Sequence, residues 1–312
     1  MSELFYILVF PGFIFLVNFA LLAEFIDRKL YARLQNRVGP PWFQPVADFI
    51  KLLAKEDIVP AESSPKMFKI APIFALAASV TAFLYIPLWK TETLFSFNGD
   101  VIVVLYLLTL PTLAFFIGGW YSTSLYSRLG SVRSLTQLFA YEVPLFMGIL
   151  SAALLADTWS LKEMVIFYTA HPYLWVFNLL GFVVSLVSLL GKLEKVPFDI
   201  PEAETEVVAG AFTEYSGRML AFLRMTLDVE MIAGSALLAV VFFPFGLDVF
   251  PVMGFLIFIV KVLVIVSLIS LLRTIVARLR MDQMVNFCWK ILVPLALLQL
   301  LLNLVLKGMF LK

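Results

Sequence analysis

Residues 251–272 read PVMGFLIFIVKVLVIVSLISLL, an apolar run in which Lys261 is the only charged side chain. About 20 consecutive apolar residues cross the hydrocarbon core of a bilayer as one helix. Seven other stretches have a similar length and character, so the sequence predicts an all-α integral membrane protein whose 312 residues form one polytopic domain. The eight expected transmembrane helices are residues 4–23, 70–89, 102–121, 137–156, 172–191, 219–243, 251–272 and 289–307.

The composition supports a membrane location and excludes several functions. The chain is 62% hydrophobic and 14% charged, whereas soluble domains are about 45–50% apolar and about 25% charged. Its net charge of +1 gives no basic surface for nucleic acid. A single cysteine, Cys288, and a single histidine, His171, cannot form an internal disulfide, a zinc site or an iron–sulfur site. We therefore expect no cofactor or metal in this chain, and any redox centre to belong to a partner.

Lysine and arginine residues are unevenly distributed between the loops. The first loop, residues 24–69, carries eight of them, and the third, fifth and seventh loops, with Lys192 counted in the fifth, carry most of the others. Only Lys90, Lys162 and the tail residues Lys307 and Lys312 fall on the opposite side. Because basic loops are retained in the cytoplasm, we expect a multi-pass protein of the cell (cytoplasmic) membrane with both termini outside.

The first loop is expected to contain two helical pieces. The helix of the first span would continue to Gly39-Pro40-Pro41, where proline stops it, with Lys29, Arg33 and Arg37 on one face. Beyond that break, the segment from about residue 43 to 56 has an apolar stripe on one side and charged side chains on the other. This pattern predicts an amphipathic helix lying in the membrane interface. Contact with lipid headgroups would explain most of these charges.

One carboxylate lies inside a span, where a charge at the bilayer centre costs at least ~2.5–3.5 kcal/mol. Glu142 falls within the fourth span, two residues before Pro144. The proline removes a backbone donor and leaves a carbonyl free for water or a side chain. An embedded acid beside such an irregularity is typical of a proton-binding site. The alternative is an acid paired with an arginine for packing alone.

A second group of carboxylates precedes the sixth span. Acids near Pro201 in a first helical turn would suit the helix dipole, but this accounts for two or three of them. On one helix Glu202 and Glu206 would share a face and Glu204 would point away. Crowding raises carboxylate pKa values and predicts proton uptake near neutral pH, with a solvated acidic loop as the alternative. The six acids, within 21 residues, are Glu194, Asp199, Glu202, Glu204, Glu206 and Glu214.

Further ionisable residues lie within the sixth and seventh spans. Arg224 and Asp228 are four residues apart and could form a pair, with Glu230 nearby. Lys261 has no acid within a turn in its own span, so it is expected to meet an acid on another helix, to meet a partner subunit, or to lose its proton. His171 is expected to be a loop residue on the outer face.

Taken together, four sequence blocks resemble the NADH dehydrogenase subunit 1 family, the membrane subunit of respiratory complex I that joins its peripheral and membrane arms. The resemblance covers nearly the whole chain and extends equally to the counterpart in energy-converting membrane-bound nickel–iron hydrogenases of the ferredoxin-linked group 4. The four blocks are Asp27–Glu56 with its Gly39-Pro40 and Gln44-Pro45 elements, Gln137–Pro144 with Tyr141-Glu142, Pro197–Tyr215, and Arg280–Lys290 with Asp282-Gln283.

The resemblance implies a role for the cytoplasmic loops and the acids. In this family the loops form a chamber against a catalytic large subunit and an iron–sulfur small subunit, while small membrane subunits and antiporter-like subunits lie alongside. The matching glutamates form an acidic path from that chamber into the membrane arm. The implied proton-relay residues are Glu142, Asp199, Glu202, Glu204, Glu206, Glu214, Asp228 and Glu230. The implied chamber or interface residues are Asp27, Arg28, Arg37, Asp48, Lys51 and Asp282.

Departures from the complex I pattern favour the hydrogenase branch. Asp27-Arg28-Lys29 stands where complex I members usually carry Glu-Arg-Lys, and the segment from Gly39 to Pro45 lacks their longer glycine-rich insertion. An expected family acid falls at Leu227, with Asp228 or Glu230 as substitutes. The compressed loop weighs against quinone binding.

Four functions remain open at this point. The first is a non-catalytic subunit that anchors a hydrogenase-like module, holds no redox centre itself, and couples electron transfer on the partners' nickel–iron and iron–sulfur centres to proton or ion translocation. The second is the quinone-chamber subunit of a complex I enzyme. The third is a standalone secondary transporter, against which the cytoplasmic motifs argue. The fourth is a passive anchor whose acids serve docking alone.

Overall fold

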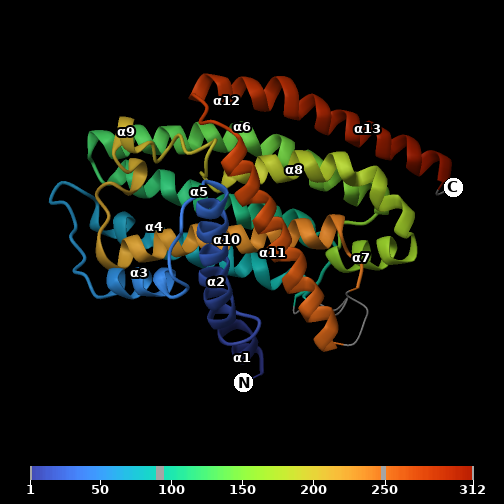
Figure 1. The fold of residues 1–312 in the computed structure, drawn as a ribbon, viewed down its shortest axis with the longest axis horizontal. Coiled ribbons are helices and arrows are strands. Elements are labelled where there is room, and N and C mark those ends of the chain that lie inside the picture. The colour runs from blue at the N-terminus through green and yellow to red at the C-terminus, as the bar shows by residue number, and fades with distance from the viewer. Residues whose placement is uncertain (1, 89–94, 247–250, 311–312) are drawn as a thin grey trace.

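The computed structural model describes residues 2–88, 95–246 and 251–310, and within these ranges the chain consists of helices and their connections, without a β-strand (Figure 1). Eight helical stretches are long and apolar enough to cross a membrane, which confirms the predicted number. They are Leu4–Leu34, Pro65–Leu84, Asp100–Tyr121, Leu125–Ala156, Pro172–Lys192, Gly217–Phe242, Val252–Ile275 and Met281–Met309.

The spans are assembled from α-helices and a few tighter or wider turns. In chain order the elements are α1 (Ser2–Leu8), α2 (Phe13–Leu34), α3 (Gln44–Leu53), α4 (Pro65–Leu84), α5 (Asp100–Tyr121), α6 (Leu125–Ala156), α7 (Leu161–Ala170), η1 (Pro172–Asn178), α8 (Leu179–Lys192), α9 (Glu204–Val207), η2 (Gly210–Phe212), α10 (Gly217–Phe242), α11 (Pro251–Ile275), α12 (Met281–Phe287), η3 (Cys288–Leu292) and α13 (Val293–Phe310).

Helix α10 forms the centre of the bundle. In its most apolar window 89% of residues are buried, against 33% for Val252–Ile275 and 28% for Met281–Met309. It packs against α2, α4 and α11, and in Figure 1 it runs across the middle of the molecule. Helices α11 and α13 therefore present apolar side chains outward, as a membrane protein requires on surfaces that face lipid or partners.

The first span begins at Leu4, as predicted, but its helix is interrupted and stops earlier than expected. It is broken between α1 and α2 at residues 9–12, where a Cβ on Gly12 would lie 1.8 Å from the carbonyl oxygen of Ile7. Helix α2 ends at Leu34, before Gly39-Pro40-Pro41, because Asn36 adopts a left-handed conformation with φ of 59°. Arg37 is therefore not on the helix that carries Lys29 and Arg33, and the expected shared face was wrong.

Other helices extend beyond the apolar runs that predicted them. Helix α6 begins at Leu125, twelve residues before the predicted span, and α4 begins at Pro65, because a helix continues through polar turns that hydropathy excludes. The last span is continuous from α12 through η3 into α13. Residue 89, the predicted end of the second span, and Lys90, one of the outer cations, lie outside the described residues.

The predicted interfacial helix is present as α3, shorter than expected, at Gln44–Leu53. Its apolar side chains Val46 and Ile50 are 40% and 58% exposed, which suits an amphipathic helix at a surface. In Figure 1, α3 and α9 lie at one end of the bundle and α7 at the other. The first and fifth loops, which contain α3 and α9 and were expected to be cytoplasmic, thus lie at the same end.

Candidate functional site

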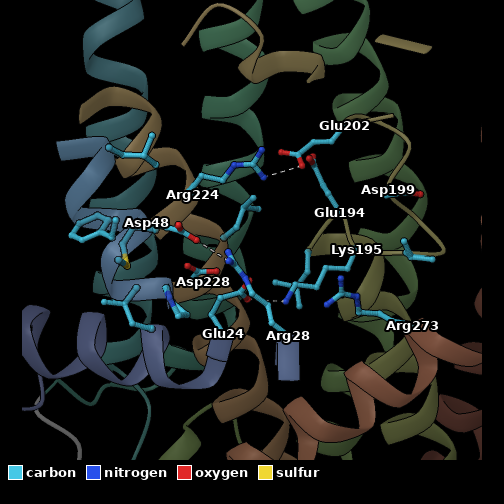
Figure 2. A pocket seen from close by; sticks show the side chains of 18 of the residues that line it. Glu24, Arg28, Asp48, Glu194, Lys195, Asp199, Glu202, Arg224, Asp228 and Arg273 are labelled. Atoms are coloured by element: carbon cyan, nitrogen blue, oxygen red, sulfur yellow. Dashed lines mark hydrogen bonds and ion pairs between the residues drawn. The ribbon is translucent and has the colours of Figure 1, made fainter. Parts of the chain in front are cut away.

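The loops gathered at that end enclose a charged cavity of about 550 Å³ (Figure 2). This volume falls in the range of small-molecule sites, about 300–1,000 Å³. Its walls come from α2, α3, the segment between α8 and α9, α10, and α11 with the loop that follows. The charged residues that line it are Glu24, Arg28, Asp48, Glu194, Lys195, Asp199, Glu202, Arg224, Asp228, Arg273 and Arg278.

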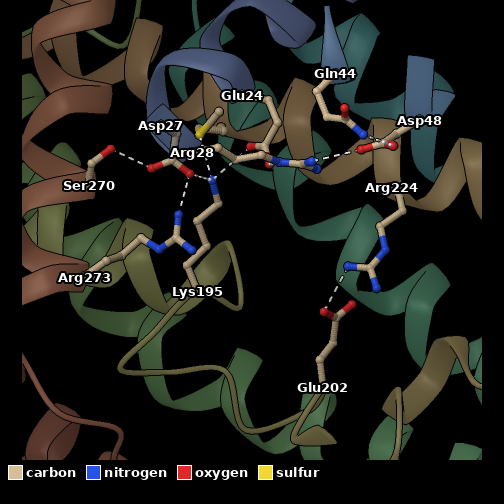
Figure 3. Close-up of polar contacts among 11 residues, drawn as sticks. Glu24, Asp27, Arg28, Gln44, Asp48, Lys195, Glu202, Arg224, Ser270 and Arg273 are labelled. Carbon is tan, nitrogen blue, oxygen red and sulfur yellow. Dashed lines mark hydrogen bonds and ion pairs between the residues drawn. The ribbon is translucent and has the colours of Figure 1, made fainter. Parts of the chain in front are cut away.

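A buried carboxylate, Asp27 on α2, ties together three segments beside this cavity (Figure 3). Asp27 is 0% exposed and accepts hydrogen bonds from Lys195 at 2.6 Å, from Arg273, and from the Ser270 hydroxyl at 2.6 Å. Burial opposes a charged ammonium, but Asp27 and Glu24 hold the pKa of Lys195 above its usual value. A buried carboxylate is stable only when its partners compensate the lost hydration, so Asp27 fixes the positions of α2, α11 and the α8–α9 segment.

A second ion-pair chain joins α2 to α3. Arg28 contacts Glu24 at 2.6 Å, one helical turn earlier, and Asp48 on α3 at 3.1 Å. The Gln44 side chain donates to the other Asp48 oxygen at 2.9 Å. Figure 3 shows this chain running along the α2 side of the cavity toward α3. The amphipathic helix is therefore held against the first span by charge as well as by packing.

The opposite wall of the cavity is acidic. Glu202 pairs with Arg224 at 3.0 Å and Asp199 with Arg278 at 3.1 Å. Figure 2 shows the carboxylates of Glu194 and Glu202 directed toward one another. One buried oxygen of each, Oε1, has no hydrogen-bond partner among the described residues. Each of these two carboxyl groups thus has one oxygen that no hydrogen-bond donor of the described residues occupies.

Glu194 is placed to titrate near physiological pH. Burial, and then the negative charge of Glu202, raise the pKa of the Glu194 carboxyl to about 8 from an ordinary value of 4.5. The residue is 7% exposed and has a left-handed φ of 50°, a conformation uncommon for a residue with a side chain. The turn it makes directs the chain from α8 into the cavity wall. The cavity therefore contains a carboxyl group whose charge changes near neutral pH.

Two predicted acids of α10 have different surroundings. Asp228 lines the cavity, but Arg224 pairs with Glu202 instead, so the suggested Arg224–Asp228 ion pair was wrong. Glu230 does not line the cavity. It is fully buried, and its carboxylate pairs with the Lys192 ammonium at 2.9 Å. Lys192 is itself 2% exposed. Its assignment to a cytoplasmic loop was therefore wrong, because it ends α8 and points inward between helices.

Glu142 lies away from the charged cavity. It lines a separate, mainly apolar cavity of about 470 Å³ between α5 and α6, with Tyr106, Leu110 and Phe139 among the other lining residues. Its neighbour Tyr141 is buried and lies 3.1 Å from the Thr112 hydroxyl. Glu142 thus lines this second cavity, between α5 and α6, and does not line the charged cavity.

Several other predicted residues lie outside the cavity. Glu206 is exposed and pairs with Arg133 at 2.6 Å, and the Arg133 guanidinium lowers the pKa of this carboxyl. Glu202 precedes α9, so it does not share a helical face with Glu206 as expected. Glu214 is half-buried and has no polar side-chain partner among the described residues. Arg37, Lys51 and Asp282 are exposed. Glu204 begins α9, and its side chain lies outside the described residues.

Lys261 has a partner that sequence reasoning did not consider. Its ammonium donates to the main-chain carbonyls of Phe243, at 2.6 Å, and Phe245. Phe243 is the C-cap residue of α10, and Phe245 lies two residues further along the chain. Carbonyl groups at the end of a helix have no donor within the helix. Lys261 of α11 thus caps α10, and within the described ranges its partners are main-chain oxygens rather than an acid on another helix, which was one of the three expected outcomes.

Several cavity residues had no predicted role. Lys195, Arg273 and Arg278 were counted only among the basic residues of the fifth and seventh loops, and Glu24 was given no role. One local signal existed, since Glu24 and Arg28 are four residues apart on a helix and such pairs attract each other. The partners of Lys195 and Arg273 are more than 160 residues away in the chain, and no local pattern reveals them.

The fold and site define a polytopic membrane protein in which the loops of one face close a charged cavity. The chain matches the NADH dehydrogenase family over residues 6–304. It is 35% identical over 306 residues to the H subunit of NADH-quinone oxidoreductase from Dehalococcoides mccartyi, covering 96% of this chain and 85% of that protein. It is 34% identical to the same subunit from Brevibacillus brevis, covering 94% and 91%.

A similar fold is found in a chain of the membrane-bound sulfane sulfur reductase, an archaeal respiratory membrane complex. The TM-score is 0.84 at 24% identity, covering 93% of this chain and 96% of that one. The chain belongs to the NADH dehydrogenase family of membrane subunits. It is a multi-pass membrane subunit of a multisubunit, complex I-like respiratory complex.

Proposed function

We propose that this chain is a non-catalytic coupling subunit. It anchors a cytoplasmic hydrogenase-like large subunit and an iron–sulfur small subunit, and it passes charge changes from their electron transfer to ion translocation by antiporter-like subunits. The nickel–iron and iron–sulfur centres belong to those partners, and electron transfer takes place outside this chain. Small membrane subunits complete the contact with the antiporter-like subunits.

The observation that carries this proposal is the pair of facing carboxyl groups, Glu194 and Glu202, in the charged cavity. Each has a buried oxygen without a hydrogen-bond partner among the described residues, and the pKa of Glu194 is raised to about 8 by burial and by Glu202. A redox event at the cavity mouth changes the local potential, and such a site responds by gaining or losing a proton. Asp199 and Asp228 extend the acidic surface, and Glu142 accepts charge deeper in the membrane.

The hydrogenase-like module is favoured over other redox modules by the compressed segment from Gly39 to Pro45. This segment connects α2 to α3, and both helices contribute walls to the cavity. A shorter connection leaves less chain to enclose a hydrophobic ligand. The cavity lining is instead dominated by charged side chains, which suits protons and ions better than a quinone ring.

The proposal is tested in inverted membrane vesicles that contain the whole complex. Ferredoxin-driven hydrogen evolution and formation of an ion gradient are measured in the same vesicles for Glu202→Gln, Glu194→Gln and Glu142→Gln. We expect electron transfer to continue while the gradient falls at least tenfold. Asp157 is exposed, pairs with Lys307 and does not line the cavity, so Asp157→Asn is the control and should behave as the unchanged protein. Normal coupling in Glu142→Gln would remove the role assigned to that residue, and normal coupling in all three would remove the proposal.

A second candidate function is a quinone chamber. Its support is the name of the curated relatives, which are subunits of NADH-quinone oxidoreductase, together with apolar cavity residues such as Phe49 and Leu52. Extraction of quinone from the purified complex, or quinone reduction that a cavity-binding inhibitor stops, would favour this function. Absence of both, with hydrogen evolution present, favours the hydrogenase-linked role.

A further inference from the structure

The end of α8 and the residues after it direct three charged side chains toward three regions of the protein. Lys192 points between α5 and α10, Glu194 points into the cavity, and Lys195 reaches Asp27 on α2. The left-handed backbone at Glu194, with φ of 50°, produces this divergence. A non-glycine residue holds such a conformation only when the surroundings enforce it. One short turn therefore connects the cavity to the interior of the helix bundle.

The Lys192–Glu230 pair is sealed from solvent. The two side chains are 1% and 0% exposed, and Nζ of Lys192 lies 2.9 Å from Oε1 of Glu230. Lys192 also donates to the main-chain carbonyl of Leu108 on α5. Glu230 has no hydrogen-bond partner of good geometry among the described residues. Its negative charge in the membrane interior thus depends on one ammonium group.

The pair lies close enough to the cavity to interact with it. The charge of Glu230 contributes, after burial and Glu202, to the high pKa of Glu194. The Gln137 side chain on α6 donates to the carbonyls of Gly191 and Phe198, both at 2.7 Å, and so fixes the chain on either side of this turn. A change of charge at Glu194 therefore changes the electrostatic potential at Glu230. The hydrogen bonds from Gln137 hold the turn that carries Glu194 in place.

We propose that Lys192 is a positioning residue that keeps Glu230 ionised inside the membrane, and that this buried pair receives the proton that leaves the cavity. This inference rests on the coupling function proposed above and adds the receiving site. In the step, an O–H bond of a cavity carboxyl group breaks and an O–H bond forms on Glu230. Glu142 is close enough to interact with Lys192, so the ammonium then keeps the Leu108 carbonyl and this weaker anion and carries a positive charge that Glu230 no longer compensates. That charge is the signal delivered to neighbouring membrane helices.

The test uses the intact complex in inverted vesicles and compares Lys192→Met, Lys192→Arg and the double variant Lys192→Met/Glu230→Gln. Replacing both members of a buried pair removes the unpaired charge that would unfold a single variant. We expect the double variant to assemble and to transfer electrons, with the ions moved per electron reduced at least tenfold. Lys192→Arg should restore coupling to within about threefold. Lys307→Met, which removes a cation of the half-exposed pair with Asp157, should change nothing.

Two outcomes separate this inference from the function on which it rests. If Glu194→Gln lacks coupling while the double variant couples normally, the pair is structural and only the present inference fails. If Glu202→Gln, Glu194→Gln and Glu142→Gln all couple normally, the coupling function itself fails. An infrared difference spectrum of the reduced against the oxidised complex adds an independent measurement. A carboxyl band that is lost in Glu230→Gln and shifted in Lys192→Arg would support the proposal, and an unchanged spectrum would contradict it.

Discussion

The ammonium of Lys195 lies 2.6 Å from the carboxylate of Asp27, a residue 168 positions earlier in the chain. Arg273 on α11 binds the same carboxylate, and its guanidinium lies over the Tyr31 ring, 4.6 Å from the ring centroid. One buried acid thus joins the first span, the α8–α9 segment and the seventh span. This junction determines where the charged cavity forms.

Loss of the Asp27 charge should destabilise the protein strongly. Asp27→Asn leaves the partly buried Arg273 without its anion and Lys195 with only Glu24, 3.4 Å away, and breaking a buried pair costs about 3–5 kcal/mol. The midpoint of thermal unfolding in detergent measures this loss. Asp157→Asn, which removes an acid that is 78% exposed and pairs with Lys307, serves as the control and should cost less than about 1 kcal/mol. Equal effects of the two substitutions would contradict the assigned role of Asp27.

The stability of the protein should depend on pH through Glu194. Its pKa rises from 4.5 to about 8 on folding, so between these values the folded chain holds more protons than the unfolded chain. The free energy of unfolding therefore falls as pH rises through this window, by at most about 1.4 kcal/mol per pH unit, and levels above about pH 8. Glu194→Gln should remove this slope. Unfolding curves measured from about pH 5 to about pH 9 test it, and parallel slopes for both proteins would rule it out.

Removal of the Lys261 ammonium should loosen the end of α10. Lys261→Met leaves the carbonyls of Phe243 and Phe245 without these donors, and an unsatisfied buried polar group costs about 1–3 kcal/mol. Hydrogen exchange at the last turn of α10 should accelerate. Lys261→Arg retains a donor and provides the comparison. Unchanged exchange in Lys261→Met would show that the cap contributes nothing.

Close packing of the acidic segment against α6 should not tolerate an added methyl group. A Cβ on Gly130 would lie 2.4 Å from the Gly210 Cα, whereas a Cβ on Gly308 would meet nothing within 4 Å. Gly130→Ala should cost about 1–3 kcal/mol through overpacking, and Gly308→Ala should be neutral or slightly stabilising. Thermal unfolding of the two variants checks this, and a reversed order would contradict the packing.

The two glutamates flanking the start of α9 should differ in importance. Glu202 faces the cavity and pairs with Arg224, whereas Glu206 is exposed and pairs with Arg133. Glu202→Gln should reduce the ion gradient formed per electron at least tenfold, and Glu206→Gln should leave it within about twofold. Vesicle assays of the two variants side by side make the comparison. A larger loss of the ion gradient in Glu206→Gln than in Glu202→Gln would contradict this prediction and would assign Glu206 to the proton relay.

Much of the fold could be predicted from local sequence. The eight spans and the amphipathic helix follow from apolar runs and from one apolar stripe, because transfer of a helix into lipid depends on its own residues. Their ends were less accurate. Helix α6 begins twelve residues before its apolar run, since polar turns continue a helix without contributing hydropathy.

The site could be predicted only in part. The crowding of Glu194, Asp199 and Glu202 was visible in the sequence because these residues are neighbours in the chain. Their arrangement was not visible, since Glu206 turns outward to Arg133 while Glu202 turns inward to Arg224. The short helix α9 begins after Glu202, at Glu204, and this boundary separates two acids that a longer helix would have placed together.

Local sequence was enough to predict eight helices long and apolar enough to cross a membrane, a number that the structure confirms, and to show six carboxylates crowded before the sixth of them. The pairing of the charges depended on the packing of the helices. Lys192 resembles a loop cation in sequence yet is buried against Glu230, and Lys195 reaches Asp27 from a distant segment. The reason is physical: insertion into lipid is a property of each helix, whereas compensation of a buried charge requires a partner that only the packing of distant helices brings within about 3 Å.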